Sequence, residues 1–392
     1  MFILTALLLV QGPSPDSLTL AQALARSRSG RGKIEAAAAG VAAARAAYRA
    51  AGAIPNPTIS YSHSEAVPRQ HLLVDQPLDW LLRRGGERQA ARYGIRSAEA
   101  DSSQVWADQA RQVRIAFYTA RAAEIAEGLT RAQATLADSV SKIGAARLRA
   151  GDISLLEAEQ GLAEAARAHQ SLSSVRENAR VTAASFARAV GADPTLPPVP
   201  VGALEAGLDN PPAHPVAIDQ VASVRIAVAD SAAAAARARS VRVGNFPLPT
   251  VQSGAEWDDP TEPGTLALIG LAIPLPLWHH GSGTAAEARA RARVAGAQVR
   301  EARVEAARLL EDARIRVVES GLRARFARDT LLPLARRLRD RALRAYQAGE
   351  TGVLPVLDAL RSERDATLAG VQDLLAYQTA LADWEALLGT VP

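Results

Sequence analysis

The sequence contains no cysteine, few aromatic residues and no long apolar run. Without cysteine the chain has no disulfide bond, thiolate metal site, thiol nucleophile or lipid-modified N-terminal cysteine. Every apolar run is shorter than the ~20 residues that a membrane-spanning helix requires. Aromatic residues make up 4% of the 392 residues, while Ala, Leu, Arg and Glu are abundant. This composition favours long helices that pack closely through small side chains.

Lysine is also nearly absent, because Lys33 and Lys142 are the only lysines among 45 basic residues. The net charge is +4 and the sequence pI is about 9.7. Arginines nevertheless alternate with acids along the expected helices, for example over residues 301–314, and do not form a one-sided basic stripe. We therefore predict no nucleic-acid partner.

The N-terminus begins with a short apolar run, Met1–Val10, followed by a proline-containing junction. The run resembles the hydrophobic region of a secretory signal, although it lacks a basic stretch and a clear small-x-small cleavage site. We expect residues 1–16 to be a signal segment that directs the chain to export.

The most informative feature present is an internal duplication. Residues 146–191 are echoed by residues 344–389 without a gap, and Gly151 and Gly349 are offset by the same 198 residues as Gly191 and Gly389. A repeat of this length indicates two fused copies of one structural unit. We place the first copy at 17–192, a proline-rich connector at 193–215 and the second copy at 216–392.

Each copy is predicted to contain a helix, two strands, a long helix, a tight turn and a return helix. The first copy has a helix from Asp16 to about Ala53, strands at about 56–64 and 69–78, a helix over 87–149, a tip turn at 150–154 and a helix over 154–190. The second copy has a helix over 216–241, strands at about 249–257 and 265–275, a helix over 285–346 with a kink at Pro333, a tip turn at 348–353 and a helix over 353–388.

The predicted strands alternate in polarity. Ile59 and Tyr61 fall on one face while Ser60 and Ser62 fall on the other, and residues 265–275 show the same period of two. Strands of about nine residues suit an outer-membrane barrel. Four strands cannot close a barrel, eight from two chains leave an interior filled by side chains, and twelve from three chains leave an open lumen. The sequence thus favours an oligomeric pore with its β part in a membrane and its α part projecting from it.

Four segments, in this order and within the duplicated framework, resemble the TolC family of outer-membrane efflux proteins. They are Leu18-Thr-Leu-Ala-Gln-Ala-Leu, Asn56-Pro-Thr-Ile, Ile273-Pro-Leu-Pro-Leu and Tyr346-Gln-Ala-Gly. The resemblance covers residues 17 to 390. It implies a homotrimer with a twelve-stranded β-barrel in the outer membrane lipid and a long α-helical barrel in the periplasm. It also implies that the tips of the α-barrel dock onto a periplasmic adaptor protein, itself coupled to an inner-membrane pump.

The two Ala-Gly-acid turns reverse the chain between antiparallel helices. Glycine tolerates the positive φ of a helix C-cap, and an acid favours the start of the next helix, so local stereochemistry alone explains these residues. The resemblance adds that the turns contact the adaptor. The contact residues it implies are Gly151, Asp152, Ile153, Ser154, Gly349, Glu350, Thr351 and Val353.

The resemblance further implies a gate at the tips. Glu157 and Tyr346 occupy positions that link neighbouring helices, and Asp358 lies where an acidic ring lines the lumen. The chain departs from the family here, because Pro355 replaces an acid and Thr351 replaces a basic partner. The alternative is that the three gate residues belong to a solvated helix face.

Aromatic residues near the expected strand ends are candidates for a belt at the membrane interface, with ordinary packing as the alternative. They are Tyr61, Trp80, Trp257 and Trp278. The adjacent His279 and His280 are poor metal ligands, because neighbouring residues rarely reach one ion from regular structure. We predict no metal and no cofactor.

No glycine-rich phosphate loop, nucleophile elbow or catalytic His–carboxylate spacing is present, so we predict no enzyme activity. Our hypothesis is a passive exit duct of a tripartite efflux or secretion system. The alternatives are a periplasmic adaptor, which would carry one hairpin between β halves, and a coiled-coil scaffold, which would not need the alternating strands.

Overall fold

The computed structural model describes residues 16–28, 32–210, 217–261, 264–278 and 280–389. The predicted signal segment lies outside these residues except for Asp16. The chain divides into two compact units: unit 1 contains Met1–Arg31, Trp106–Val216 and Arg308–Pro392, and unit 2 contains Gly32–Val105 and Ala217–Ala307. Because each unit draws on both halves of the sequence, the boundaries of the two predicted copies stay a prediction.

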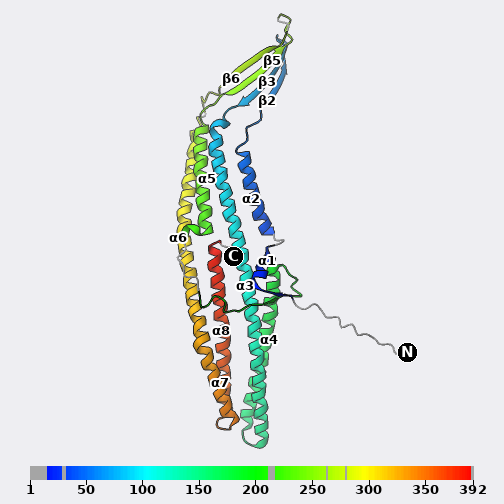
Figure 1. Cartoon of the computed structure of the whole chain (residues 1–392), viewed down its shortest axis with the longest axis vertical. Coiled ribbons are helices and arrows are strands. Elements are labelled where there is room, and N and C mark those ends of the chain that lie inside the picture. Colours follow the sequence, from blue (N-terminus) through cyan, green and yellow to red (C-terminus); the bar gives the residue numbers. More distant parts are fainter. Residues whose placement is uncertain (1–15, 29–31, 211–216, 262–263, 279, 390–392) are drawn as a thin grey trace, which may run out of the picture. The chain divides into compact units, whose positions relative to one another are not determined.

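The order of the elements confirms the expected mainly helical fold with strands, because helix, two strands, long helix, turn and helix occur twice (Figure 1). The first series is β1 (Ser17–Leu18), α1 (Leu20–Ser27), α2 (Gly32–Ala50), β2 (Thr58–His63), β3 (Gln70–Pro77), α3 (Trp80–Ala150) and α4 (Leu155–Val190). After β4 (Val199–Pro200) and a 3₁₀ turn (Ile218–Gln220) come α5 (Ala222–Gly244), β5 (Thr250–Trp257), β6 (Leu266–Ala272), α6 (Ser282–Phe326), a π-helical segment (Ala327–Leu331), α7 (Leu332–Gln347) and α8 (Val353–Leu387).

Unit 2 contains an antiparallel sheet with the strand order β2-β3-β5-β6. Figure 1 shows these strands side by side, and no described helix packs across either face. The strands have 6, 8, 8 and 7 residues, shorter than the predicted nine. The edge strands β2 and β6 have a partner on one side only, which leaves a row of unpaired backbone groups along each edge.

The helices of unit 2 approach one another through small residues. An added Cβ at Gly86 of α3 would lie 2.7 Å from the Cβ of Ser240 on α5, so the helices nearly touch there. The Ser240 hydroxyl donates a hydrogen bond of 3.1 Å to the Arg83 carbonyl, and Arg83 Nη2 donates one of 2.9 Å to the Gly244 carbonyl. This contact agrees with the prediction of helices that pack closely through small side chains.

Unit 1 holds two buried clusters along its helices. In the first, Phe117 of α3 meets Phe186 of α4 edge to face, and Leu204 of the connector covers them. In the second, Val140 of α3 packs against Tyr346 of α7 and four residues of α8. The two helical hairpins α3–α4 and α7–α8 therefore share a core within unit 1.

The prediction of one helix from Asp16 to Ala53 is wrong. Residues 17–18 form β1, which pairs in parallel with β4, and the amide of Val199 donates to the Asp16 carbonyl at 2.9 Å. Helix α1 begins only after Thr19, whose side chain forms a capping box with Gln22. The backbone groups of residues 16–18 are thus satisfied by the connector and are not available to a helix.

The predicted kink at Pro333 takes the form of a π-helical segment directly before it. Proline lacks an amide hydrogen, so it cannot donate to the carbonyl four residues earlier. Helix α6 widens over Ala327–Leu331 and resumes as α7, in which Pro333 is the second residue. Such single-turn π bulges accommodate a local mismatch inside a long helix.

Candidate functional site

The sheet of unit 2 has two faces of opposite character, because paired residues on neighbouring strands point to the same side. On the apolar face, Tyr61 lies beside Leu72 and Leu72 beside Ala255. The further apolar residues of this face are Ile59, Val74, Val251, Trp257, Ala267, Ile269 and Leu271. The side chain of Ile269 is 86% exposed and that of Ile59 is 68% exposed. The face also carries His63, Gln70, Gln76 and Ser253, so it is an uncovered, mainly apolar surface rather than part of a core.

The opposite face is mainly polar. It carries Thr58, Ser60, Ser62, His71, Asp75, Thr250, Gln252 and Glu256, with Leu73, Leu266 and Leu268 among them. Gln252 Nε2 donates a hydrogen bond of 2.9 Å to Asp75 Oδ1. His71 Nδ1 lies 3.1 Å from Glu256 Oε1 on the neighbouring strand. We call these two surfaces the apolar face and the polar face.

Two of the predicted belt residues meet on the apolar face. The rings of Tyr61 and Trp257 are stacked with centroids 6.4 Å apart, and the Tyr61 hydroxyl donates to Gln70. Trp80 instead opens α3, with the guanidinium of Arg84 5.5 Å from its ring centre. Trp278 follows β6 and is almost fully exposed. His279 lies outside the described residues.

The two tip turns have the same backbone geometry. Gly151 and Gly349 take φ values of +78° and +77°. The amide of Asp152 donates to the Arg147 carbonyl and that of Glu350 to the Ala345 carbonyl, each at 2.9 Å. Only glycine adopts this left-handed conformation without strain, so the matching turns follow from the matching glycines.

The helices that follow the turns start differently. Ser154 caps α4 and forms a capping box with Glu157, whereas Gly352 caps α8 without a side-chain bond. Ile153 and Thr351 are half-buried, and Val353 is buried in the second cluster. An added Cβ at Gly352 would lie 3.0 Å from Glu157 Oε1, so the carboxylate of Glu157 at the start of α4 reaches the second tip turn.

Tyr346 is fully buried within the chain. The guanidinium of Arg147 on α3 lies 5.1 Å from its ring centre, and Arg147 Nη1 donates a hydrogen bond of 3.1 Å to its carbonyl. The Tyr346 hydroxyl is buried and has no hydrogen-bond partner among the described residues. Tyr346 therefore joins the two hairpins through its ring and backbone.

Asp358 is exposed on α8 and contacts Arg361 at 3.4 Å. Arg361 also binds Glu164 of α4, with Nη2 at 2.7 Å and Nε at 3.2 Å from Oε2. Burial acts to raise the pKa of the Glu164 carboxyl, but hydrogen bonds and charge from Arg361 and Arg167 outweigh it and hold this pKa below its usual value. The Glu164–Arg361 pair is a second link between the hairpins. The sequence did not single it out, because Glu and Arg recur throughout these helices.

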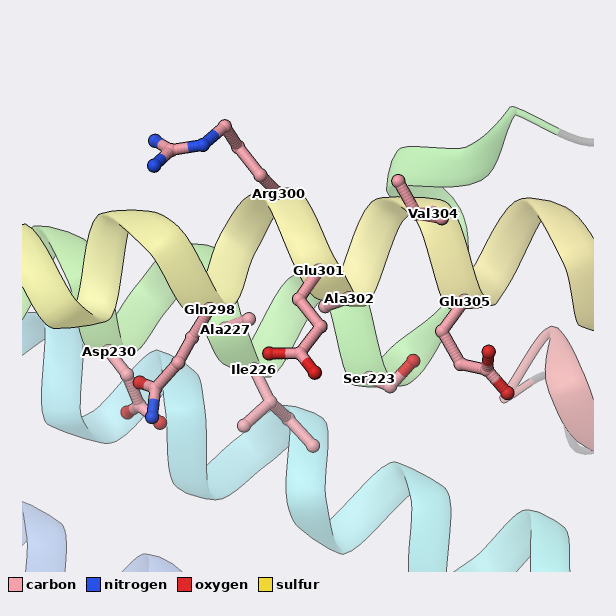
Figure 2. Close-up of a pocket in the computed structure, with 10 residues that line it drawn as sticks. All are labelled: Ser223, Ile226, Ala227, Asp230, Gln298, Arg300, Glu301, Ala302, Val304 and Glu305. Carbon is pink, nitrogen blue, oxygen red and sulfur yellow. The ribbon is translucent and has the colours of Figure 1, made fainter.

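A groove of about 740 Å³ lies along α5 and α6 in unit 2 (Figure 2). Asp230, Glu301 and Glu305 supply its carboxylates, and Ile226 and Val304 its larger apolar side chains. The ten residues drawn in Figure 2 include no histidine, lysine or cysteine.

Within the described ranges, no three His, Asp or Glu side chains are arranged to hold a metal ion. Among the described helices, none has an apolar stretch long enough to cross a bilayer.

Comparison with solved structures identifies the fold. VceC, an outer membrane protein of Vibrio cholerae, superposes with a TM-score of 0.74 at 20% identity and covers 94% of this chain and 95% of its own. The CmeC outer membrane channel of Campylobacter jejuni has a TM-score of 0.67 at 14% identity, over 94% and 85%. The open-state MtrE outer membrane channel of Neisseria gonorrhoeae has a TM-score of 0.61 at 19% identity, over 94% and 88%.

No protein-family model matches the sequence, and no curated protein sequence matches it either. The similarity to these outer membrane proteins is therefore a similarity of backbone fold, and it extends over 94% of the chain. This chain has the fold of the outer-membrane channel proteins, as its resemblance to the TolC family predicts.

Proposed function

We propose that this chain is one protomer of an outer-membrane channel that serves as the exit duct of an efflux or secretion system. The observation that carries the proposal is the uncovered sheet of unit 2 with one apolar and one polar face. Alternation of apolar and polar side chains, with aromatic residues at the strand ends, is what a barrel wall between lipid and water requires. The shared fold with two outer membrane channels supports the same function.

The open edges of the sheet favour assembly with further copies. Strand β6 of one chain can pair with β2 of the next, which removes both rows of unpaired backbone groups. Three copies give twelve strands and a lumen, whereas two give a barrel filled by side chains. The proposed assembly is thus a homotrimer in the outer membrane, with its helical part in the periplasm.

The tips are the proposed docking surface for a periplasmic adaptor, and an inner-membrane pump acts through that adaptor. Gly151, Asp152, Ile153 and Ser154 form the first tip, and Gly349, Glu350, Thr351 and Val353 the second. Transport through the duct is passive and needs no cofactor. Opening requires the hairpins to separate where Arg147 meets Tyr346 and where Glu157 meets Gly352, and Asp358 is exposed for a role in the lumen.

A matched pair of substitutions on β6 tests the proposal. Ile269→Arg places a charge on the apolar face, and Leu268→Arg places the same charge on the polar face one residue away. A cationic side chain facing lipid costs about 2–4 kcal/mol near the bilayer midplane, whereas one facing the lumen stays in water. We expect Leu268→Arg to be recovered as a crosslinkable trimer in the outer-membrane fraction and Ile269→Arg to be depleted from it.

Two results would contradict the proposal. Recovery of the unaltered chain as a soluble monomer would favour an adaptor or a scaffold. Equal membrane recovery of both variants would mean that the apolar face does not contact lipid.

A further inference from the structure

The four strands of the sheet contain no lysine or arginine, although the chain has 45 basic residues. Their only carboxylates are Asp75 on β3 and Glu256 on β5. Both lie on the polar face, since Asp75 pairs with Gln252 and Glu256 pairs with His71. The formal charge of the sheet is therefore negative and confined to one side.

No fixed positive charge on the sheet offsets either carboxylate. Asp75 accepts a hydrogen bond from the neutral amide of Gln252 at 2.9 Å. Glu256 lies 3.1 Å from His71 Nδ1, and an imidazole is charged only when protonated. Two rows of paired residues, which we call levels, cross the sheet at the two acids. Thr58, Asp75, Gln252 and Gly270 form one level, and Ser62, His71, Glu256 and Leu266 form the other. Both acids are thus held in place by cross-strand partners that carry no fixed positive charge.

We infer that Asp75 and Glu256 make the β part of the channel prefer cationic and neutral solutes over anions. The inference rests on the proposed function, in which the polar face lines the lumen and each carboxylate occurs three times around it. The two levels are four residues apart along β3, or about 13 Å. Rings of carboxylates raise the local concentration of cations and exclude anions, most strongly when the Debye length reaches across the lumen.

The experiment measures the ratio of K⁺ to Cl⁻ permeability in planar lipid bilayers that contain the purified full-length protein. The zero-current potential under a tenfold KCl gradient at low ionic strength gives this ratio. We expect Asp75→Asn/Glu256→Gln to lower it about twofold or more, and Leu268→Arg, which adds a positive charge to the same face, to lower it independently. The difference from the unaltered channel shrinks in concentrated KCl, because a Debye length of about 3 Å at 1 M no longer spans the lumen.

Two controls isolate the sheet from other charges. Asp193→Asn/Glu205→Gln removes the same number of carboxylates from exposed positions on the connector in unit 1, and we expect no change. Repeating the comparison in an Asp358→Asn background separates the sheet from the acid near the tips, and the effect of the double variant persists there.

The outcomes separate this inference from the function on which it rests. An unaltered protein that forms no conducting channel overturns the proposed function and removes the basis of the inference. A conducting channel whose permeability ratio is unchanged in the double variant, or changed equally by the connector control, overturns the inference alone.

Discussion

Neutralising Glu164 should weaken the attachment of the first hairpin to the second. Its carboxylate is 7% exposed and accepts hydrogen bonds through one oxygen from two arginines. Arg361 approaches across the hairpins from α8 with two nitrogens at 2.7 and 3.2 Å, and Arg167 approaches along α4 with one at 3.2 Å. The two partners share the acceptor, so each serves as a control for the other.

The expected magnitudes follow from exposure and geometry. A hydrogen bond to a charged group contributes about 1.5–3 kcal/mol. Arg361 is 40% exposed and Arg167 is 62% exposed, so each can turn to water once the carboxylate is gone. We therefore expect a coupling free energy of about 1–2 kcal/mol between Glu164 and Arg361, which makes two bonds. For Glu164 and Arg167, three residues apart on one helix and with the arginine largely in solvent, we expect less than about 0.5 kcal/mol.

Double-mutant cycles measure both couplings. Glu164→Gln is combined with Arg361→Gln in one cycle and with Arg167→Gln in the other. The free energy of unfolding comes from urea titrations of the purified protein in detergent, followed by circular dichroism at one protein concentration, because an oligomer's stability depends on concentration. A coupling with Arg361 below about 0.3 kcal/mol, or one no larger than that with Arg167, would refute the assignment of an inter-hairpin link.

Three further results are expected. Folding lowers the pKa of Glu164, so its ionised carboxylate stabilises the folded chain above the usual pKa of 4.5, and this contribution is lost as the pH falls through the lower pKa of the folded state. Glu164→Gln should therefore make the free energy of unfolding less dependent on pH in the acid range, as measured by urea titrations at several pH values. Tyr377→Phe removes a 2.7 Å hydrogen bond to a connector carbonyl and should cost about 1–2 kcal/mol, with faster limited proteolysis of the connector as the check. Gly254→Ala should reduce the yield of assembled trimer, since its Cβ would lie 2.3 Å from the Leu72 carbonyl oxygen, whereas Gly270→Ala, whose nearest atom would be 3.4 Å away, should not.

Much of the fold could be predicted because its signals are local. The tip turns at Gly151 and Gly349 could be predicted from their glycines, because the positive φ of the turn favours glycine. The absence of proline from residues 87–149 likewise predicts the long helix α3, because a proline inside a helix removes a backbone hydrogen bond and kinks or breaks the helix. The single helix expected up to Ala53 failed for a nonlocal reason, since the pairing of Leu18 with Pro200 involves segments far apart in the sequence.

The links between the hairpins could not be predicted from local signals. Glu164 and Arg361 lie 197 residues apart, and both helices carry many similar acids and arginines. The resemblance placed Tyr346 at a gate, but its complete burial against Arg147 and Val140 depends on how three helices pack. Residue type and resemblance thus suggest which residues could link the hairpins, but only the packing of the helices shows which of them are buried and which partners they contact.

The alternation of apolar and polar residues predicts the two faces of the sheet in some strands but not in others. In β2 and β5 the larger apolar side chains fall on odd-numbered positions, so a period of two assigns the apolar face correctly there. Strand β6 also carries Leu266 and Leu268 on even-numbered positions of the polar face, so its alternation is weaker. Strand β3 reads Leu72-Leu73-Val74 and has no alternation at its centre. Its register with β5 puts Leu73 on the polar face together with Asp75, and a slip of one residue would move Asp75 to the apolar face. The charge of the proposed lumen is therefore a property of strand pairing, fixed by contacts between residues about 180 positions apart, and it could not be inferred from β3 by itself.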